Sequence, residues 1–401
     1  MRLLFALAAK HDWNIDHLDV CTAFLNGDLE EVIYMELPEG YDIKGESNKV
    51  CKLRKSVYGL KQAARSWNKK ATEVLKGLGY RQTCSEPCIY TKQKGNSIIN
   101  IALYVDDFFI FHNDNVEVEN LKRKLQQCFK VKDLGPVKKC LGMEVKRDRA
   151  KKTIKLTQTQ YLNNVLKRFN IPNETKPVSH PMEPNSKLKP LPKSRKSTEN
   201  LDNVPYQQAI GSLMYLAVCT RPDISFAMTY LSQFNTCYTR EHWVLLKRVL
   251  KYLNTTKDVG IVYSQNDDQL EGFSDADWGG NLDRRSFSGS VFKLSGAAIS
   301  WRCKKQRTVA LSTTEAEYMA LSETAKEAIF LRKLWFEICN KQITIPIFCD
   351  NRGALAIAKN PVNNDRTKHI DIRVHFIREK VESKELSVHY IPGNQLVADG
   401  C

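Results

Sequence analysis

Residues 98–111 read IINIALYVDDFFIF, two apolar runs that are interrupted by Tyr104-Val105-Asp106-Asp107. Isoleucine, valine and aromatic side chains favour β-strands, so this stretch predicts two strands joined by a turn. Two adjacent carboxylates there are costly, because an unpaired charge in an apolar core loses several kcal/mol or changes its pKa until it is neutral. A turn that presents Asp106 and Asp107 to a metal ion removes this cost, and hard oxygen ligands suit Mg²⁺. The alternative is an Asp-Asp turn on an exposed hairpin.

A third carboxylate, Asp19, lies at the end of another strand-like run over residues 15–20. Three carboxylates on adjacent strands can hold two metal ions about 4 Å apart. One ion would activate a primer hydroxyl, and the other would hold the triphosphate leaving group. The two stretches together therefore indicate a phosphoryl-transfer site.

The bulk composition allows several domains and favours a polyanionic partner. The chain has 401 residues, of which 42% are hydrophobic, and this is enough for two or three domains with their own cores. A charged fraction of 26% and a mean hydropathy of −0.42 are typical of an ordinary soluble protein. The net charge of +16 favours nucleic acid, because cations placed on phosphates release counterions. Many basic proteins bind no nucleic acid, so charge alone leaves both readings open.

Membrane and disulfide frameworks are not expected. No stretch approaches the roughly 18 apolar residues that cross a bilayer. Residues 1–9 resemble a signal peptide only superficially, since Lys10-His11-Asp12 follows without a cleavage pattern; they predict one amphipathic helix. The cysteines are scattered, and the closest pair, Cys84 and Cys88, lacks the spacing of a zinc site. Free thiols fit a reducing cytosol or nucleus.

The chain divides at a Pro-rich stretch, residues 177–205, which predicts a linker. Before it we expect strands over 15–20, 32–37 and 98–110, helices over 61–78 and 116–129, and a hairpin of 141–146 with 153–156. After it we expect helices over 206–219, 222–237 and 241–253. An α/β unit follows, with strands over 270–274, 288–294, 298–301, 345–349 and 386–391 and helices over 313–339, 351–358 and 371–380. The linker also carries a basic patch, either solvated or in contact with nucleic acid: Lys187, Lys189, Lys193, Arg195 and Lys196.

A second set of acids is spread over the α/β unit. Asp275 follows a strand, Glu317 lies in the first turns of a helix that Ser312 or Thr313 can cap, and Asp350 ends a buried strand. Asp399 is expected on a final helix. Such acids can converge on two metal ions, as phosphodiester hydrolysis requires. Each acid alone is most often a solvated surface charge, so the hypothesis depends on the ordered set. Asp277 and Glu315 are close in sequence to Asp275 and Glu317, and we rank them second as candidates for this site.

Basic side chains flank the first of these acids. The cluster consists of Arg284, Arg285, Arg302, Lys304, Lys305 and Arg307, with Trp278 and Trp301 nearby. Cations and aromatic rings together favour a surface for an RNA–DNA hybrid. The alternative is that the hairpin is basic only because the whole protein is basic, and that it binds no nucleic acid.

Several motifs resemble those of copia-type retrotransposon Pol polyproteins. The segments that carry the resemblance are 18–27 (LDVCTAFLNG), 56–67 (SVYGLKQAARSW), 104–107 (YVDD), 133–135, 141–145, 206–215, 220–224 and 246–253. The resemblance then extends over nearly all of residues 270–401. It covers the whole chain.

The resemblance implies an α+β and α/β multidomain chain. Its parts would be a reverse transcriptase palm with an antiparallel sheet (1–176), the linker (177–205), a helical connection (206–266) and a ribonuclease H-like α/β domain (267–401). It implies metal ligands at Asp19, Asp106 and Asp107, and at Asp275, Glu317, Asp350 and Asp399, with two Mg²⁺ or Mn²⁺ ions per site.

The resemblance also implies substrate contacts in the palm. Phe24 would be a gate that excludes the ribonucleotide 2′-hydroxyl, or else a core residue. Gly59, Lys61 and Tyr104 would lie near nucleotide and template, although Lys61 could be an ordinary cation at a helix start. The implied partners are RNA template, DNA primer, RNA–DNA hybrid and deoxynucleoside triphosphates, with integrase and protease parts upstream and no membrane. The implied location is cytoplasmic, in a virus-like particle, or nuclear, and not secreted.

Two departures from the family pattern bear on activity. The fingers region that would precede Asp19 is expected to be missing, and the end after Asp399 is expected to be clipped. The loop before Asp399 also lacks the histidine that many ribonucleases H place there. We therefore expect impaired polymerisation by this chain and retained hydrolysis. The alternative is a truncated, non-catalytic remnant that binds nucleic acid.

Overall fold

The computed structural model describes residues 1–41, 49–172, 174, 176–183, 204–266, 268–359 and 371–399. The chain forms two compact units. We call residues 12–137 with 337–340 the palm unit, and residues 1–11, 138–336 and 341–401 the C-terminal unit. The basic patch of the expected linker lies outside the described residues.

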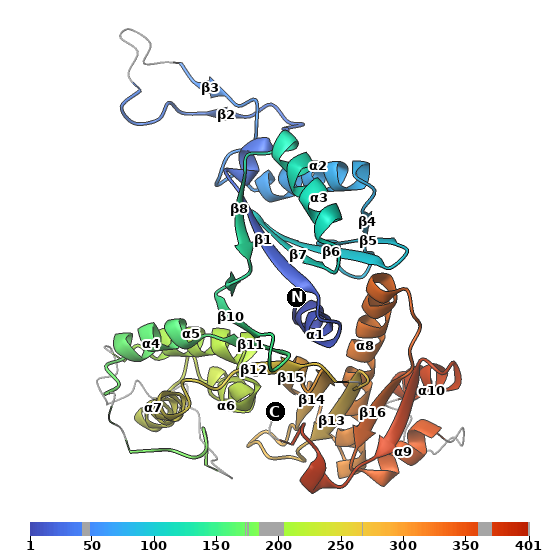
Figure 1. The fold of residues 1–401 in the computed structure, drawn as a ribbon. Coiled ribbons are helices and arrows are strands. Elements are labelled where there is room, and N and C mark those ends of the chain that lie inside the picture. Colours follow the sequence, from blue (N-terminus) through green and yellow to red (C-terminus); the bar gives the residue numbers. More distant parts are fainter. Residues whose placement is uncertain are drawn as a thin grey trace. The chain divides into compact units, whose positions relative to one another are not determined.

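The palm unit is built on one antiparallel sheet, as expected for this half (Figure 1). The strand order is β4 (Arg81–Gln82), β5 (Ile89–Lys94), β6 (Ser97–Tyr104), β7 (Asp107–His112), β1 (Asn14–Val20) and β8 (Val131–Pro136). The predicted stretch 98–110 is the β6–β7 hairpin, whose turn lies at Val105-Asp106. β1 pairs with β7 along its length, which brings the two predicted acidic segments onto neighbouring strands.

Two helices, α2 (Ala63–Gly77) and α3 (Asn115–Cys128), cover one face of this sheet (Figure 1). Leu18 and Val20 of β1 pack in the same core as Trp67 of α2 and Leu121 of α3. Because side chains alternate along a strand, His17 and Asp19 lie on the opposite face. The alternation therefore keeps the carboxylate of Asp19 away from the helix-covered core.

One predicted strand of the palm unit is wrong in length. Residues 32–37 form only β2 (Tyr34–Met35), which pairs with β3 (Cys51–Lys52). The side chains of Val32, Tyr34 and Met35 are exposed, so no core holds the rest of the run in an extended pairing.

Helices pack together in the middle of the C-terminal unit. They are α4 (Thr159–Arg168), α5 (Tyr206–Cys219), α6 (Ser225–Ser232) and α7 (Arg240–Thr255). The hairpin of β10 (Met143–Asp148) and β11 (Thr153–Thr157) is confirmed, and it extends to β9 (Lys139–Cys140) and β12 (Ile261–Ser264). The predicted helix 222–237 is wrong at both ends. It begins as the 3₁₀ turn η2 (Pro222–Ile224) because proline opens it, and its α-helical part ends at Ser232.

The first helix, α1 (Arg2–Lys10), belongs to the C-terminal unit and is not amphipathic. Every side chain from Leu3 to Ala9 is buried, because the helix packs against β11, β12 and β15 (Ala297–Lys305). Arg2 lies over the ring of Trp301 at 3.9 Å and donates to the carbonyl oxygen of Ile299 at 2.8 Å. These contacts fix α1 against the last third of the chain.

The last part of the C-terminal unit is the expected α/β domain (Figure 1). Its sheet has the order β15, β14 (Phe287–Leu294), β13 (Glu271–Ala276), β16 (Ile345–Cys349) and β17 (Leu386–Tyr390). The first three strands are antiparallel, and β16 and β17 run parallel to β13. The helices are α8 (Thr313–Cys339), α9 (Arg352–Lys359) and α10 (Asp371–Glu382). Asp399 lies in a turn and not on the expected final helix.

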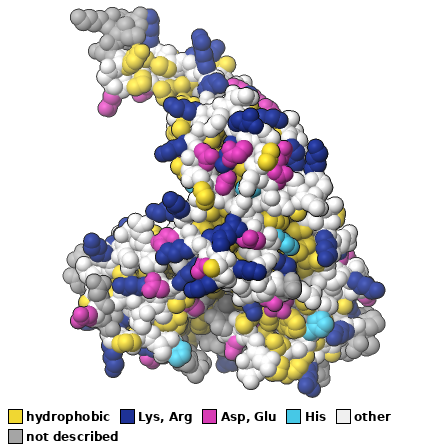
Figure 2. Space-filling model, in the orientation of Figure 1, with side chains coloured by type: hydrophobic (Ala, Val, Ile, Leu, Met, Phe, Trp, Pro, Cys, Tyr) yellow, Lys and Arg dark blue, Asp and Glu magenta, His cyan; other side chains and the backbone are white. Residues whose placement is uncertain are grey.

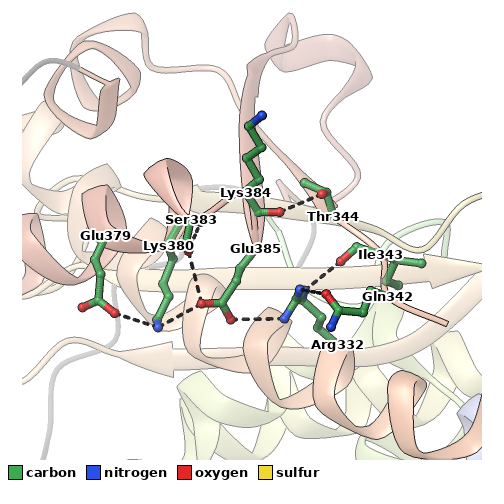
Figure 3. A network of polar contacts seen from close by, with 9 residues as sticks. All are labelled: Arg332, Gln342, Ile343, Thr344, Glu379, Lys380, Ser383, Lys384 and Glu385. Carbon is green, nitrogen blue, oxygen red and sulfur yellow. Dashed lines mark hydrogen bonds and ion pairs between the residues drawn. The ribbon is translucent and has the colours of Figure 1, made fainter. Parts of the chain in front are cut away.

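A polar network fastens the start of β16 and β17 (Figure 3). Arg332 of α8 donates to the carbonyl oxygen of Ile343 at 2.7 Å and pairs with Glu385 at 3.3 Å. Lys380 of α10 pairs with the same Glu385 at 3.1 Å. Because the network lies at the amino ends of these parallel strands, it leaves their carboxyl ends open for chemistry.

No helix in the described part of the chain is both long and apolar enough to cross a membrane. On the face drawn in Figure 2, lysine and arginine side chains are distributed widely and are interspersed with acids. The net positive charge of the chain is therefore not confined to one patch on this face.

A buried lysine provides a test of the palm packing. Lys122 of α3, with a side chain 9% exposed, pairs with Asp16 of β1 at 2.8 Å and Asp133 of β8 at 3.1 Å. Lys122→Met removes this cation from both carboxylates, although His112 stays 3.7 Å from Asp16, so we expect a loss of about 3 kcal/mol in the free energy of unfolding. Urea denaturation measures it, with the exposed Lys124→Met as control. Equal effects of the two substitutions would contradict the assigned role.

Candidate active sites

Strand register brings two acids together in the C-terminal unit. β13 runs parallel to β16 with Phe273 opposite Phe348. Two residues further along each strand, Asp275 and Asp350 come level with one another at the carboxyl ends. Their side chains lie on the same face of the sheet because alternation is equal on both strands. This is the edge at which α/β sheets present functional groups.

A helix cap positions the third acid. Ser312 accepts a hydrogen bond from the backbone N–H of Glu315 at 3.2 Å, and the Glu315 carboxylate accepts one from Leu311 at 2.8 Å. These two reciprocal hydrogen bonds cap the start of α8 and engage the carboxylate of Glu315. Glu317 lies two residues further along α8, roughly 200° around the helix axis from Glu315, so its side chain points to the other side of the helix. Its side chain is buried, with 6% exposed.

The ligand atoms of Glu317, Cys349 and Asp350 lie within 4.8 Å of one another. In the described part of the chain this is the one group of three potential ligands at that spacing. Burial raises the pKa of the Cys349 thiol to about 12, so it stays protonated and can donate to Glu317 at 3.8 Å. A protonated thiol is no ligand for Mg²⁺, which leaves the carboxylates as the oxygen donors.

Asp399 completes the set from an exposed turn after η4 (Gly393–Gln395). Its backbone N–H donates to the carbonyl oxygen of Leu396 at 3.2 Å, which closes the turn. Burial, followed by the charges of Asp399 and Asp350, raises the pKa of Asp275 to about 6. Asp275 and Asp399 are therefore electrostatic neighbours, although neither belongs to the group within 4.8 Å.

Among these carboxyls the pKa of Glu317 is raised furthest. Burial, then the charges of Asp275 and Asp350, raise the pKa of its carboxyl to about 8. Like charges crowded in a site of low exposure favour uptake of a proton or binding of a cation. A set of oxygen donors with this excess of negative charge fits a divalent cation.

In the palm unit, Asp19 and Asp107 are direct cross-strand partners. The turn between β6 and β7 is tight, with Val105 at φ +53° and its carbonyl oxygen accepting from the indole N–H of Trp67. The carbonyl oxygen of Asp106 accepts from Val20 at 2.8 Å. The sheet thus brings these three acids side by side, but their oxygens are not within 4.8 Å of one another.

Sequence reasoning missed His17. Its Nε2 lies 2.6 Å from an oxygen of Asp107, and its ring stacks on Phe109 with centroids 4.6 Å apart. Strand alternation could have found it, because His17 is two residues before Asp19 on the same face of β1. The histidine fixes one carboxylate oxygen of Asp107 and leaves the other for a ligand.

The other palm residues lie on loops around these acids. Phe24 is half-buried against the palm core and packs on the exposed Tyr58 with ring centroids 4.6 Å apart. Gly59 adopts φ +98°, which favours glycine, and the Lys61 side chain is exposed just before α2. Tyr104 is 54% exposed at the end of β6. Phe24 therefore has both a packing contact and an accessible neighbour.

The basic cluster separates into two groups. Arg284 and Arg285 are exposed on the loop between β13 and β14. Arg302 and Lys304 stand on one face of β15, opposite Ser290 and Ser288 of β14, while Lys305 pairs with Asp283 at 2.9 Å.

The expected role of Trp301 is wrong. Its ring packs against the buried cluster that contains Phe273, and its indole N–H donates to the carbonyl oxygen of Ala217 at 2.7 Å. It is half-buried and lies beneath Arg2, so its ring is engaged in packing within the protein. Trp278 is 57% exposed.

The chain resembles known proteins over its whole length. The family model described as "Reverse transcriptase (RNA-dependent DNA polymerase)" matches residues 1–184. The Retrovirus-related Pol polyprotein from transposon TNT 1-94 of Nicotiana tabacum is 44% identical over all of this chain, which spans 30% of that polyprotein. The Putative transposon Ty5-1 protein YCL074W of Saccharomyces cerevisiae is 33% identical over 77% of this chain and 100% of that protein.

A solved structure shares the fold. The foamy viral protease-reverse transcriptase in complex with dsDNA matches with a TM-score of 0.52 at 12% identity, over 97% of this chain and 70% of that one. The likeness supports the order of a reverse transcriptase-like part followed by an α/β part.

The raised pKa of Glu317 predicts a pH-dependent stability. Its carboxyl ordinarily titrates near 4.5 and here near 8, so the folded state loses stability as pH rises between these values. Glu317→Gln removes the carboxyl whose charged form is disfavoured by burial and by the charges of Asp275 and Asp350. In a metal chelator we expect the variant to be more stable than the unaltered chain by roughly 2 kcal/mol at pH 8, with a smaller gap at pH 5. Urea denaturation at both pH values measures this. The exposed Glu382→Gln is the control, and a gap independent of pH would argue against the acid cluster.

Proposed function

Because the chain belongs to the copia-type retrotransposon Pol family, as a segment with a reverse transcriptase region and a ribonuclease H-like region, we propose a specific chemistry for each unit. The C-terminal unit hydrolyses the RNA strand of an RNA–DNA hybrid. The palm unit carries the carboxylates for RNA-directed DNA synthesis. The first proposal rests chiefly on the convergence of Glu317 with Asp350, beside Asp275 and Asp399.

In the C-terminal unit, Asp275, Glu317, Asp350 and Asp399 would hold Mg²⁺ or Mn²⁺. The clustered oxygens and the high proton affinity of Glu317 support this fit. When bound at such carboxylates, two ions activate the attacking oxygen and stabilise the leaving oxygen of a phosphodiester. Asp275 and Asp350 are held rigidly at strand ends, and the α8 cap holds Glu317, so the ligand set is preorganised.

The palm unit would use Asp19, Asp106 and Asp107 in the same way. Asp19 and Asp107 face one another across two strands, an arrangement that is unfavourable for like charges unless a cation joins them. His17 orients Asp107 through its hydrogen bond. Phe24 would lie beneath the sugar of the incoming nucleotide, with Tyr104, Gly59 and Lys61 nearby.

The partners follow from these two reactions. RNA template, DNA primer, hybrid and deoxynucleoside triphosphates would be the ligands, with exposed Arg284 and Arg285 and the β15 cations contacting backbone phosphates. The chain spans about 30% of the tobacco polyprotein it matches, and integrase and protease parts would belong to a longer product. We place this chemistry in a cytoplasmic virus-like particle or the nucleus.

Cleavage of a labelled RNA strand in an RNA–DNA hybrid tests the nuclease. With Mg²⁺ or Mn²⁺, we expect cleavage by the unaltered chain and a loss of at least about a hundredfold for Asp350→Asn, since a ligand oxygen is replaced. The exposed Asp258→Asn is the matched control and should cleave normally. Absence of cleavage by the unaltered chain, with salt-sensitive hybrid binding retained, would instead indicate a binding remnant.

Primer extension on an RNA template tests the palm. Phe24→Ala removes the ring that would clash with a 2′-hydroxyl, so we expect the preference for deoxynucleotides over ribonucleotides to fall by roughly tenfold or more. Phe24→Tyr keeps the ring and should keep the preference. Unchanged selectivity with lower thermal stability would make Phe24 a packing residue. We expect extension by the unaltered chain to be slow, and its complete absence, even with Mn²⁺, would favour the alternative of a non-catalytic remnant that binds nucleic acid.

A further inference from the structure

Phe24 lies in a short 3₁₀ turn, η1 (Ala23–Asn26), which follows β1 and its carboxylate Asp19. Ala23 is fully buried in the palm core, whereas the ring of Phe24 is only half-buried at the edge of that core. A partly exposed side chain changes rotamer quickly unless something holds it. A ring that is to reject one additional oxygen atom needs a fixed position, so its contacts outside the core decide whether it can act as a gate.

A buried serine fixes the backbone of this turn. Ser56 lies between β3 and α2, and its side chain is fully buried. Its hydroxyl donates to the carbonyl oxygen of Phe24, and its backbone N–H donates to the carbonyl oxygen of Gly27 at 3.0 Å. One residue therefore holds the turn at two carbonyl groups, the first of which belongs to the gate residue itself.

The backbone of the turn also packs closely on α2. A Cβ atom added to Gly27 would lie 2.9 Å from the hydroxyl oxygen of Ser56 and 2.9 Å from the backbone nitrogen of Trp67, so a larger residue would force the two segments apart. The indole N–H of Trp67 donates to the carbonyl oxygen of Val105, in the turn between β6 and β7. Trp67 therefore connects η1 to the turn that carries the adjacent carboxylates.

The ring of Tyr58 packs on Phe24 from outside the core. The two ring centroids are 4.6 Å apart and the ring planes are tilted by 51°, an arrangement in which aromatic rings attract one another. Tyr58 is 55% exposed, so it contacts Phe24 on a side that the core leaves open. It lies two residues after Ser56 on the same segment. The segment that holds the backbone of Phe24 therefore also holds its ring.

We propose that Ser56 and Tyr58 form a clamp that determines sugar selection at the palm carboxylates, an inference that rests on the gate function proposed for Phe24. Ser56 is a positioning residue that acts through the backbone of Phe24. Tyr58 is a second specificity-determining residue, whose ring prevents Phe24 from rotating away when a 2′-hydroxyl presses against it. Because that hydroxyl distinguishes a ribonucleotide from the matching deoxynucleotide, a displaced ring would admit both.

The test measures nucleotide binding by the full chain without bond formation. The chain is bound in Mg²⁺ to an RNA template with a labelled DNA primer that ends in a dideoxynucleotide, and the complementary deoxy- or ribonucleoside triphosphate is added. All chains carry Asp350→Asn, so that the template is not cleaved. Retention of the primer in a salt challenge gives an apparent Kd for each triphosphate, and the ratio of the two Kd values is the sugar preference. Binding of primer and template without nucleotide shows that each variant is folded.

We expect Tyr58→Ala to reduce this preference roughly fivefold and Ser56→Ala roughly threefold, the effects of losing an aromatic pair and one hydrogen bond. Tyr58→Phe keeps the ring and should keep the preference. Two matched controls should leave it unchanged. Tyr41→Ala removes another exposed tyrosine of the palm unit, and Thr83→Val removes another buried hydroxyl that donates to a backbone carbonyl oxygen.

The same substitutions in a Phe24→Ala background separate positioning from direct contact with the nucleotide. If the clamp acts through Phe24, Tyr58→Ala and Ser56→Ala should change the preference no further once the Phe24 ring is absent. An effect of undiminished size in that background would overturn the inference. Replacement of Tyr58 or Ser56 that leaves the preference unchanged in the presence of Phe24 would also overturn it.

Failure of the gate and failure of the clamp are distinguishable. A preference that falls in Phe24→Ala but in neither clamp variant keeps the gate and rejects the clamp. A preference that Phe24→Ala does not change rejects the gate, and the clamp with it. If neither triphosphate increases primer retention by the chain with an intact palm, the nucleotide-binding function proposed for the palm unit is itself wrong, and both are rejected.

Discussion

The parallel pairing of β13 with β16 is the constraint on which the C-terminal site depends. It aligns Asp275 with Asp350 at one sheet edge, while the network of Arg332, Lys380 and Glu385 ties down the other edge. A shift of one residue in this register would turn one of the two carboxylates to the far side of the sheet.

The carboxylates of the two acid clusters have different surroundings and are positioned in different ways. In the C-terminal unit, burial followed by the charges of neighbouring acids raises the pKa of Glu317 and of Asp275. In the palm unit Asp107 has a neighbouring imidazole, His17, at hydrogen-bond distance. One cluster is thus preorganised by backbone ends and a helix cap, and the other by a hairpin turn and a side-chain partner. Both arrangements leave carboxylate oxygens that protein groups do not neutralise.

Much of the fold follows from local sequence. Apolar periodicity located α5, α8 and β16 at their observed bounds, because these elements bury long regular faces. It failed for residues 32–37, where no core supports the run, and for residues 222–237, where proline starts a 3₁₀ turn. The order of the acids indicated a site, but distances could not be derived, since register and burial are tertiary properties. For the same reason the packing of Trp301 beneath Arg2 could not be derived from the sequence.

The burial of α1 has a consequence for the order in which the chain folds during synthesis. Its residues leave the ribosome long before β15 does, yet the carbonyl oxygen of Ala6 accepts from Ser295, and Arg2 reaches Ile299. Until almost three hundred further residues have been made, the native surface that covers seven successive apolar side chains is incomplete, because β15 is missing from it. Contacts of such sequence separation form slowly. The C-terminal unit therefore cannot reach its native packing before β15 has emerged.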